Sequence, residues 1–163
     1  MTIRDTTVTL NDGSETTLND IAGSNLILLV NTASECGLKT QFEHLANLQD
    51  TYGDRGLTVV GAPCNQFKGQ EPLSDAEIAT KYAEEYNVNF PLLAKLEVNG
   101  ENAHPIYQEL VTAKDEEGEA GEIQWNFEKF LIADDGSVVA RVRPMTTPDD
   151  PVVIQTLEEN LPE

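Results

Sequence analysis

Cys36 is the residue of this chain whose type and setting best suit covalent chemistry. It follows an apolar run at residues 26–30 and precedes Gly37 and a segment of helical periodicity that starts at Phe42. A free thiol has a pKa of about 8.5, and backbone N–H groups at a helix start, together with a cation such as Lys39, favour the reactive thiolate. We therefore predict a nucleophilic Cys36 in an exposed turn between a strand and a helix. The alternative is a cysteine that only fills a small apolar space.

The second cysteine, Cys64, follows another apolar run in the sequence Ala-Pro-Cys-Asn-Gln-Phe. Only Lys68 lies close enough in sequence to activate its thiol, so we interpret Cys64 as a packed cysteine. A Cys36–Cys64 disulfide stays open at this point, because it requires Cα atoms within about 7 Å of each other and the sequence does not give that distance.

Trp125 is the only tryptophan and is expected at the head of a strand, directly after an acidic segment. Ordinary core packing is one interpretation, but an indole N–H at a strand end can also be directed into a pocket. His44 and His104 are far from each other and from both cysteines in the sequence, so no zinc-ligand spacing occurs. No glycine-rich phosphate loop or Ser/His/Asp arrangement occurs either, and we predict neither a metal nor a cofactor.

The elements that must position these residues alternate between strands and helices. A turn at Asn11-Asp12-Gly13 predicts an opening hairpin over residues 6–18, and a capping box at Ser74 and Glu77 predicts the start of a helix. The βαβα order predicts a parallel pair of strands with a right-handed crossover. The expected elements are strands at 26–30, 57–62, 127–132 and 137–143, and helices over 42–53, from 74, after Pro105 and from Pro151.

Composition excludes several partners. The chain has 163 residues, with 10 basic and 29 acidic side chains and a formal charge of −19, which disfavours nucleic acid and anionic membranes. No apolar run reaches the ~18 residues of a membrane span, and the first residues lack the features of a signal peptide. We expect one domain at residues 1–163, cytoplasmic, with a core that needs no disulfides. Residues 115–122 are expected to form a solvated loop.

Three blocks of this sequence resemble, in order, the signatures of the glutathione peroxidase family: residues 31–37 (NTASECG), 62–72 (APCNQFKGQEP) and 125–131 (WNFEKFL). Asn89-Phe90-Pro91 and the closing Arg143-Pro144 also fit. The resemblance spans nearly the whole chain. It implies an α/β protein with a thioredoxin-like fold, in which a central mixed sheet is flanked by helices and preceded by an N-terminal β-hairpin.

The resemblance also implies a function and a site. Family members reduce hydrogen peroxide and organic hydroperoxides, so Cys36 would be the peroxidatic residue, with Gln70, Trp125 and Asn126 as its partners. Glutamine, tryptophan and asparagine suit peroxide reduction, since neutral amide and indole N–H donors can stabilise a thiolate before the reaction and a leaving alkoxide during it. The product is a sulfenic acid that a thiol then reduces.

The sequence departs from the family pattern in four ways that bear on the expected function. Cysteine occupies the position where some relatives carry selenocysteine, which implies slower but intact chemistry. Ala62 and Lys68 replace the usual Phe and Gly, and Lys68 brings a cation near the expected site. The loop before Trp125 is too short for the oligomerisation segment of tetrameric relatives, which implies a monomer. Tyr82 occupies the position where thioredoxin-using relatives carry a resolving cysteine.

The reductant therefore stays open. An external thiol such as glutathione is the leading hypothesis, and a Cys36–Cys64 disulfide reduced by thioredoxin is the alternative. A peroxide sensor that relays oxidation to a partner protein, and a thioredoxin-like binding module without redox function, are hypotheses from other classes. Residues 30–72 carry three basic and five acidic side chains, so most of the negative charge lies elsewhere. We expect the mouth of the site to be less acidic than the remaining surface, which suits a small anionic or neutral partner.

Overall fold

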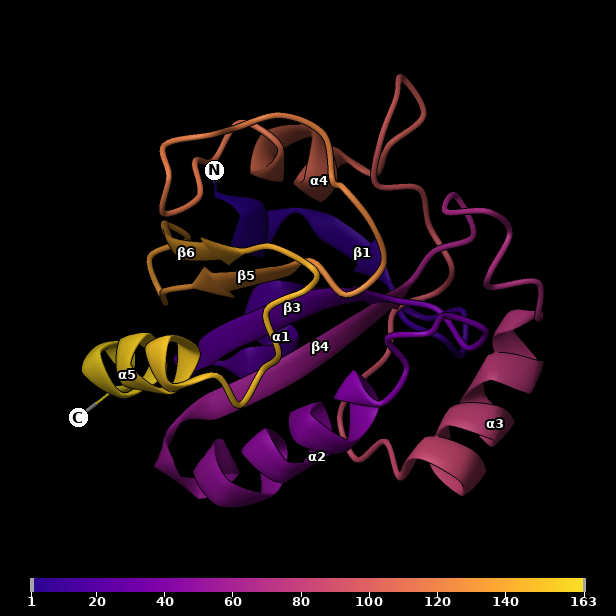
Figure 1. Ribbon diagram of the computed structural model, residues 1–163, viewed down its shortest axis with the longest axis horizontal. Coiled ribbons are helices and arrows are strands. Elements are labelled where there is room, and N and C mark those ends of the chain that lie inside the picture. Colours follow the sequence, from indigo (N-terminus) through magenta and orange to yellow (C-terminus); the bar gives the residue numbers. More distant parts are fainter. Residues whose placement is uncertain (1, 163) are drawn as a thin grey trace.

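A four-stranded mixed sheet forms the centre of the protein (Figure 1), and the computed structural model describes residues 2–162. The strand order is β4-β3-β5-β6. Strands β3 and β4 are parallel, and β5 runs antiparallel to β3 and to β6. The bounds are β3 Leu26–Thr32, β4 Leu57–Pro63, β5 Lys129–Ile132 and β6 Val138–Val142. These pairings confirm the parallel pair expected from the βαβα order and the mixed sheet of a thioredoxin-like fold.

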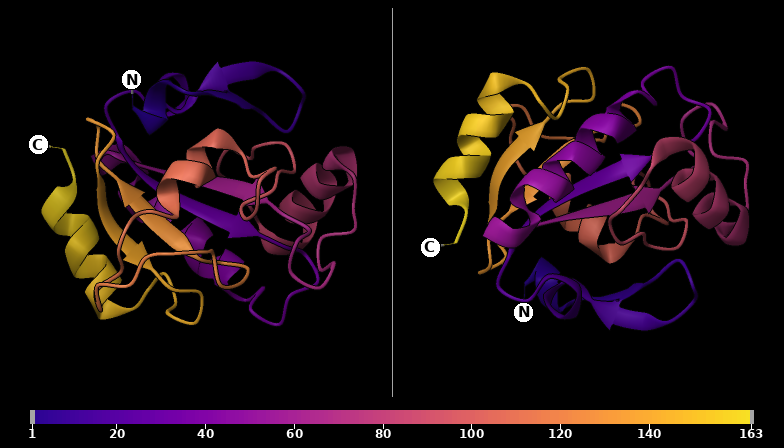
Figure 2. Two further views of the ribbon diagram at one scale, coloured as in Figure 1. Left: turned by 90° about the horizontal axis from the view of Figure 1, so that it is seen from above. Right: turned by 90° about the horizontal axis from the view of Figure 1, so that it is seen from below.

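Helices cover both faces of this sheet, and a separate two-stranded hairpin precedes it (Figure 2). Among residues 2–162, no helix combines the length and apolar character that a membrane span requires. The hairpin strands are β1 Thr7–Thr9 and β2 Glu15–Thr17. The α-helices are α1 Leu18–Ala22, α2 Gln41–Tyr52, α3 Asp75–Tyr86, α4 Pro105–Leu110 and α5 Pro151–Asn160, with short 3₁₀ turns at Ile3–Asp5 and Gly53–Arg55.

Strand β3 divides the hydrophobic core into two clusters, because its alternate residues point to opposite faces of the sheet. Ile27 and Leu29 pack with α1, α4 and the hairpin, a set that we call the hairpin-side cluster. Leu28 and Val30 pack with α2, α3 and α5, a set that we call the α2-side cluster. All seven residues of β3 are buried, as its uninterrupted apolar run predicts for a central parallel strand.

The structure differs from the sequence-based expectation at two places. Leu18 was expected in the second hairpin strand, but it opens the short helix α1, whose N-cap is the Thr17 hydroxyl. Strand β5 begins at Lys129 rather than at Phe127, because the backbone of Phe127 has φ of 69°, in the left-handed region that a strand cannot contain. As a consequence Trp125 does not head a strand, and it lies in a turn four residues before β5.

Three cations lie inside this acidic protein: Arg4, Lys129 and Arg141 are each at most 3% exposed. The Arg141 guanidinium pairs with the equally buried Glu128 carboxylate at 2.7 Å. The other two donate to backbone carbonyl oxygens: Arg4 to four of them between Gly23 and Ala133, and Lys129 to those of Phe127 and Pro144. Burial lowers the pKa of the Lys129 ammonium to about 7, although the charge of Glu128 opposes this shift.

This pKa predicts how stability depends on pH. Between pH about 7 and about 10 the folded protein releases the Lys129 proton while the unfolded chain retains it, so unfolding takes up a proton and stability rises with pH. Relative to Lys129→Met, the wild-type free energy of unfolding should therefore increase by roughly 1 kcal/mol per pH unit in this range. Urea denaturation of both proteins at a series of pH values measures the difference, and a constant difference would contradict the assignment.

Candidate active site

Cys36 lies in the turn between β3 and α2, but it is only 1% exposed. The turn is exposed at Glu35 and Gly37, as expected, but the Cys36 side chain is not, because it packs into the α2-side cluster, which also contains Ala33 and Phe42. Its Sγ accepts the backbone N–H of Leu38 at 3.3 Å. Helix α2 starts only at Gln41, so a backbone amide within the turn, and not the first turn of the helix, supplies the donor.

Gln70 is half-buried in the loop after β4, and two hydrogen bonds join it to other parts of the site. Its backbone carbonyl oxygen accepts the N–H of Glu35, the residue before Cys36, at 2.9 Å. Its side-chain Oε1 accepts from the Asn126 Nδ2 at 2.9 Å. Gln70 therefore links the Cys36 turn to the turn that contains Asn126.

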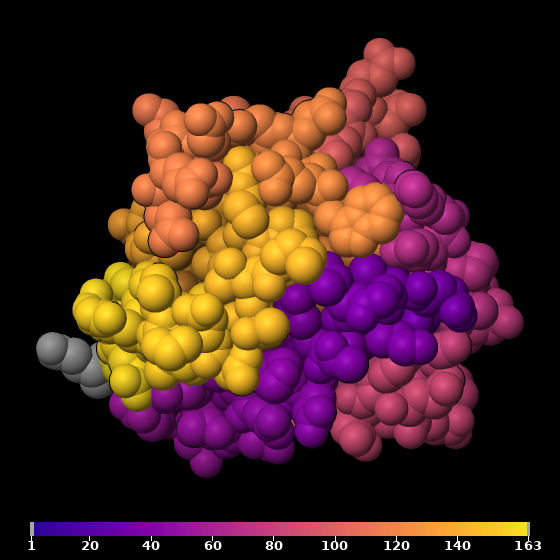
Figure 3. Space-filling model, in the orientation of Figure 1, coloured from indigo at the N-terminus to yellow at the C-terminus, as the bar shows by residue number. Residues whose placement is uncertain are grey.

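Trp125 and Asn126 occupy the turn before β5, and Asn31 at the end of β3 holds this turn in place. The Asn31 side-chain amide donates to the Trp125 carbonyl oxygen at 3.1 Å, and the Phe127 N–H donates to the Asn31 carbonyl oxygen at 2.7 Å. The half-buried Trp125 contacts both hydrophobic clusters, with its ring centroid 5.5 Å from that of Phe67. Figure 3 shows the orange segment around residue 125 against the purple segment that follows β3.

The four residues singled out in the sequence thus come from three turns that meet at the carboxyl end of β3. Hydrogen bonds join the Cys36 turn, Gln70 and Asn126, and Trp125 packs against the cluster that contains Cys36. Asn126 is fully buried, and its Oδ1 has no hydrogen-bond partner within residues 2–162. A buried acceptor without a partner is able to take a hydrogen bond from an O–H or N–H group of a bound molecule.

A buried carboxylate, which the sequence analysis did not single out, fixes the turn before Cys36. Glu71 is fully buried and accepts the Ser34 N–H at 3.1 Å, the Ser34 hydroxyl at 2.7 Å and the Tyr82 hydroxyl. The Tyr82 hydroxyl also lies 3.1 Å from the Thr32 hydroxyl. Burial, followed by the nearby Glu71 carboxylate, raises the pKa of Tyr82, so this side chain stays neutral. The only signal in the sequence was the position of Glu71 directly after Gln70.

Cys64 is a packed cysteine, as predicted. It is fully buried in the hairpin-side cluster, whereas Cys36 belongs to the α2-side cluster, so the two free thiols lie on opposite sides of the sheet. Burial raises the pKa of the Cys64 thiol, which donates weakly to Gln66 Oε1 at 3.6 Å. A thiol of this kind is largely protonated at neutral pH and reacts slowly.

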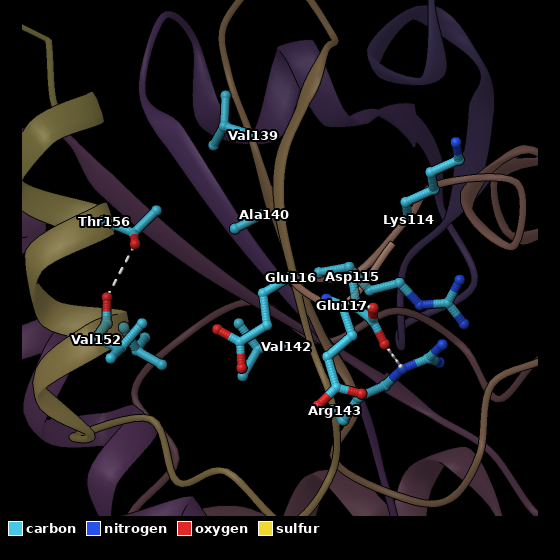
Figure 4. Close-up of a pocket in the computed structure, with 12 residues that line it drawn as sticks. Lys114, Asp115, Glu116, Glu117, Val139, Ala140, Val142, Arg143, Val152 and Thr156 are labelled. Atoms are coloured by element: carbon cyan, nitrogen blue, oxygen red, sulfur yellow. Dashed lines mark hydrogen bonds and ion pairs between the residues drawn. The ribbon is translucent and has the colours of Figure 1, made fainter. Parts of the chain in front are cut away.

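The groove shown in Figure 4 lies apart from these residues. It has a volume of about 340 Å³ and is lined by residues 114–117, by β6 and by α5. The Arg143 Nε donates to the Asp115 carboxylate at 2.8 Å on its edge. A hydrogen bond from the Glu119 backbone and the one from Arg143 lower the pKa of Asp115, which anchors the start of the otherwise exposed 115–122 loop. This groove contains none of Cys36, Gln70, Trp125 and Asn126.

Comparisons with known proteins identify the family of this chain and relatives with the same fold. The sequence pattern of the family described as glutathione peroxidase matches residues 3–111. The thioredoxin/glutathione peroxidase BtuE of Escherichia coli is 45% identical over 166 aligned positions, which cover 90% of each chain. The hydroperoxy fatty acid reductase Gpx2 of Synechocystis is 45% identical and covers 87% of this chain and 88% of its own. The crystal structure of T. cruzi GPX1 superposes with a TM-score of 0.74 and 29% identity over 97% of both chains.

The hydrogen bonds that Glu71 accepts from Ser34 and Tyr82 predict how removal of the Tyr82 hydroxyl changes stability. Tyr82→Phe leaves the buried carboxylate without one of its donors, so we expect the free energy of unfolding to fall by about 1–3 kcal/mol. Tyr86→Phe is the matched control on the same helix, since the partly buried Tyr86 hydroxyl donates to the neutral Ser34 carbonyl oxygen at 2.8 Å. Its expected loss is about 0.5–1.5 kcal/mol. Urea denaturation measures the free energy of unfolding of both variants. If Tyr82→Phe lost no more stability than Tyr86→Phe, the hydrogen bond from Tyr82 to the buried Glu71 would not have the predicted effect.

Proposed function

The chain belongs to the glutathione peroxidase family, and we propose that it is a thiol-dependent peroxidase that reduces hydrogen peroxide and organic hydroperoxides at Cys36. One observation carries the assignment of the site. The hydrogen bonds from Glu35 to Gln70 and from Asn126 to Gln70 bring two neutral amide side chains to the turn that holds the buried thiol. A cysteine that only fills space in a core does not need neutral amide side chains at its turn.

In the proposed reaction the Cys36 thiolate attacks one oxygen of the hydroperoxide. A bond forms between sulfur and the terminal oxygen, which keeps its hydrogen, and the oxygen–oxygen bond breaks. The second oxygen leaves as an alkoxide or hydroxide and takes up the proton that the Cys36 thiol released on ionisation, which gives an alcohol or water. Cys36 is thereby oxidised to a sulfenic acid, and the hydroperoxide is reduced. The Leu38 N–H stabilises the thiolate, and the Asn126 amide and Trp125 indole N–H stabilise the leaving oxygen without forming a fixed ion pair.

An external thiol such as glutathione closes the cycle in this proposal. Two thiol equivalents return the sulfenic acid to the thiol, with formation of one disulfide and one water. After Cys64 the chain contains no further cysteine, and Tyr82 is fully buried and bonded to Glu71. The E. coli relative is named for both thioredoxin and glutathione. A Cys36–Cys64 disulfide is the second candidate, but it requires thiols on opposite sides of the sheet to meet.

The surroundings of the site support a small or anionic reductant. Lys39 is exposed in the same turn as Cys36, and Lys68 is exposed in the loop after β4. Most of the acidic side chains lie outside residues 30–72. Cations at the mouth attract an anionic thiol, and this attraction weakens as salt is added. We also keep as proposals the cytoplasmic location, the single domain and the monomeric state expected from the sequence.

The identity of the nucleophile is tested with two serine variants. Cys36→Ser should lower peroxidase activity by more than about a thousandfold, because the nucleophile of the reaction is lost. Cys64→Ser serves as the matched control and should retain activity if Cys64 only packs. The measurement is hydroperoxide-dependent NADPH consumption with glutathione and its reductase. Full activity of Cys36→Ser would remove the basis of the proposal.

The reductant is tested by comparing two coupled systems and by mass spectrometry. Turnover with glutathione and its reductase should exceed turnover with thioredoxin and its reductase. After one equivalent of hydrogen peroxide, the intact mass should show the gain of one oxygen atom. Loss of two hydrogen atoms instead would indicate a Cys36–Cys64 disulfide and favour thioredoxin. Oxidation of Cys36 without turnover in either system would favour the peroxide sensor.

A further inference from the structure

Lys129, the first residue of β5, has its side chain inside the protein on the same side as Cys36. It is fully buried and pairs with Val30 across the antiparallel register. Alternation along the strand places it on the same face as Leu131, which belongs to the α2-side cluster together with Val30 and Cys36. A lysine is seldom fully buried, so this position calls for a physical reason.

The Lys129 ammonium joins three segments of the chain. Its Nζ donates to the Phe127 carbonyl oxygen at 2.5 Å and to the Pro144 carbonyl oxygen at 3.3 Å. The same Pro144 oxygen accepts the Gln41 side-chain amide at 2.8 Å, and Gln41 is the first residue of α2. In Figure 3 the gold segment after β6 lies beside both the orange segment around residue 125 and the purple segment after β3. Lys129 therefore lies where the turns of the site meet.

No carboxylate pairs with this ammonium within residues 2–162. The neighbouring Glu128 is committed elsewhere, since Arg141 lies 2.7 Å and Arg143 3.0 Å from its Oε2. The Gln124 N–H donates to its other oxygen at 3.0 Å. Burying a cation without a counter-ion is costly, and a methionine at this position would avoid that cost. What Lys129 provides and a methionine would not is therefore its hydrogen bonds to the Phe127 and Pro144 carbonyl oxygens.

One of those bonds acts on a residue with a left-handed backbone conformation near the site. Phe127 is a non-glycine residue with φ of 69°, a conformation that persists only when surrounding contacts hold it. Asn31 holds its N–H and Lys129 holds its carbonyl oxygen. Trp125 and Asn126 directly precede Phe127, so the backbone conformation of Phe127 sets their orientation relative to β5, and a change at Phe127 moves both.

We propose that Lys129 is a positioning residue of the peroxidase site, whose ammonium fixes the turn at residues 125–127 and the start of α2 so that Trp125 and Asn126 face Cys36. Lys129 acts through these backbone bonds and does not touch the hydroperoxide. The inference rests on the proposed function only in taking Cys36 as the reacting residue.

The test compares Lys129→Met, which has similar length but no donor, with the matched control Arg4→Met. Arg4 is also a buried cation bonded to backbone carbonyls, but it lies at the opposite end of β5, near Ile132 and Ala133. The first readout is the fluorescence of Trp125, the only tryptophan, measured in the reduced protein as its emission wavelength and its quenching by acrylamide. The second is the single-turnover rate of Cys36 oxidation by hydrogen peroxide, measured by stopping the reaction chemically and determining the intact mass.

Lys129→Met should shift the Trp125 emission, increase its quenching and slow Cys36 oxidation by about 10- to 100-fold, the loss typical of groups displaced by about 1 Å. Arg4→Met should melt at a lower temperature but match the wild type in both readouts. Unchanged emission and oxidation in Lys129→Met would overturn the inference, as would equal changes in Arg4→Met. If Lys129→Met does not fold, Lys129→Leu, which also has no donor, decides by the same criteria.

The outcomes also separate this inference from the proposed function. If wild-type Cys36 does not react with hydrogen peroxide, the proposed function fails, while the Trp125 measurements on the reduced protein still report on Lys129. If the wild type reacts and Lys129→Met matches it in both readouts, the positioning role fails and the peroxidase assignment is unaffected.

Discussion

The complete burial of β3 is the constraint on which the rest of the structure depends. A strand that is covered on both faces cannot leave the backbone groups near its end to water, so other segments must provide their hydrogen-bond partners. The Asn31 carbonyl oxygen accepts the Phe127 N–H, and past the strand the Glu35 N–H donates to the Gln70 carbonyl oxygen. These partners come from the two sequence blocks that follow Cys36. The bonds that complete a buried strand therefore also assemble the candidate site.

Local patterns in the sequence predicted the parts of this structure that local physics determines. The apolar run at 26–30 predicted β3, and the Ser74–Glu77 capping box predicted the start of α3, with both of its reciprocal hydrogen bonds present. The order of strands and helices predicted the parallel pair β3 and β4. Similarity to a family, and not periodicity, identified Gln70 and Asn126, and the structure adds the hydrogen bond between them.

The features that the sequence did not predict all depend on contacts between distant segments. The burial of Cys36 depends on packing against α2 and α3, which no pattern near residue 36 encodes. The left-handed backbone of Phe127 shortens β5, although aromatic residues usually favour strands. Glu71 looked like one of 29 acidic residues, yet it is buried and bonded to Ser34 and Tyr82, which lie 37 and 11 residues away. A charge placed inside the protein by tertiary structure has no signature in composition.

The same distinction explains how a chain with a formal charge of −19 is compatible with the thiolate that we propose at Cys36. Within residues 2–162 the fully or nearly fully buried charges are three cations, Arg4, Lys129 and Arg141, and two carboxylates, Glu71 and Glu128. The exposed surface is therefore at least as acidic as the whole chain. Surface charges are screened over about 8 Å at physiological salt, whereas charges in the interior are screened much less. The donors and cations near the carboxyl end of β3, and not the net charge, thus determine whether a thiolate is tolerated there.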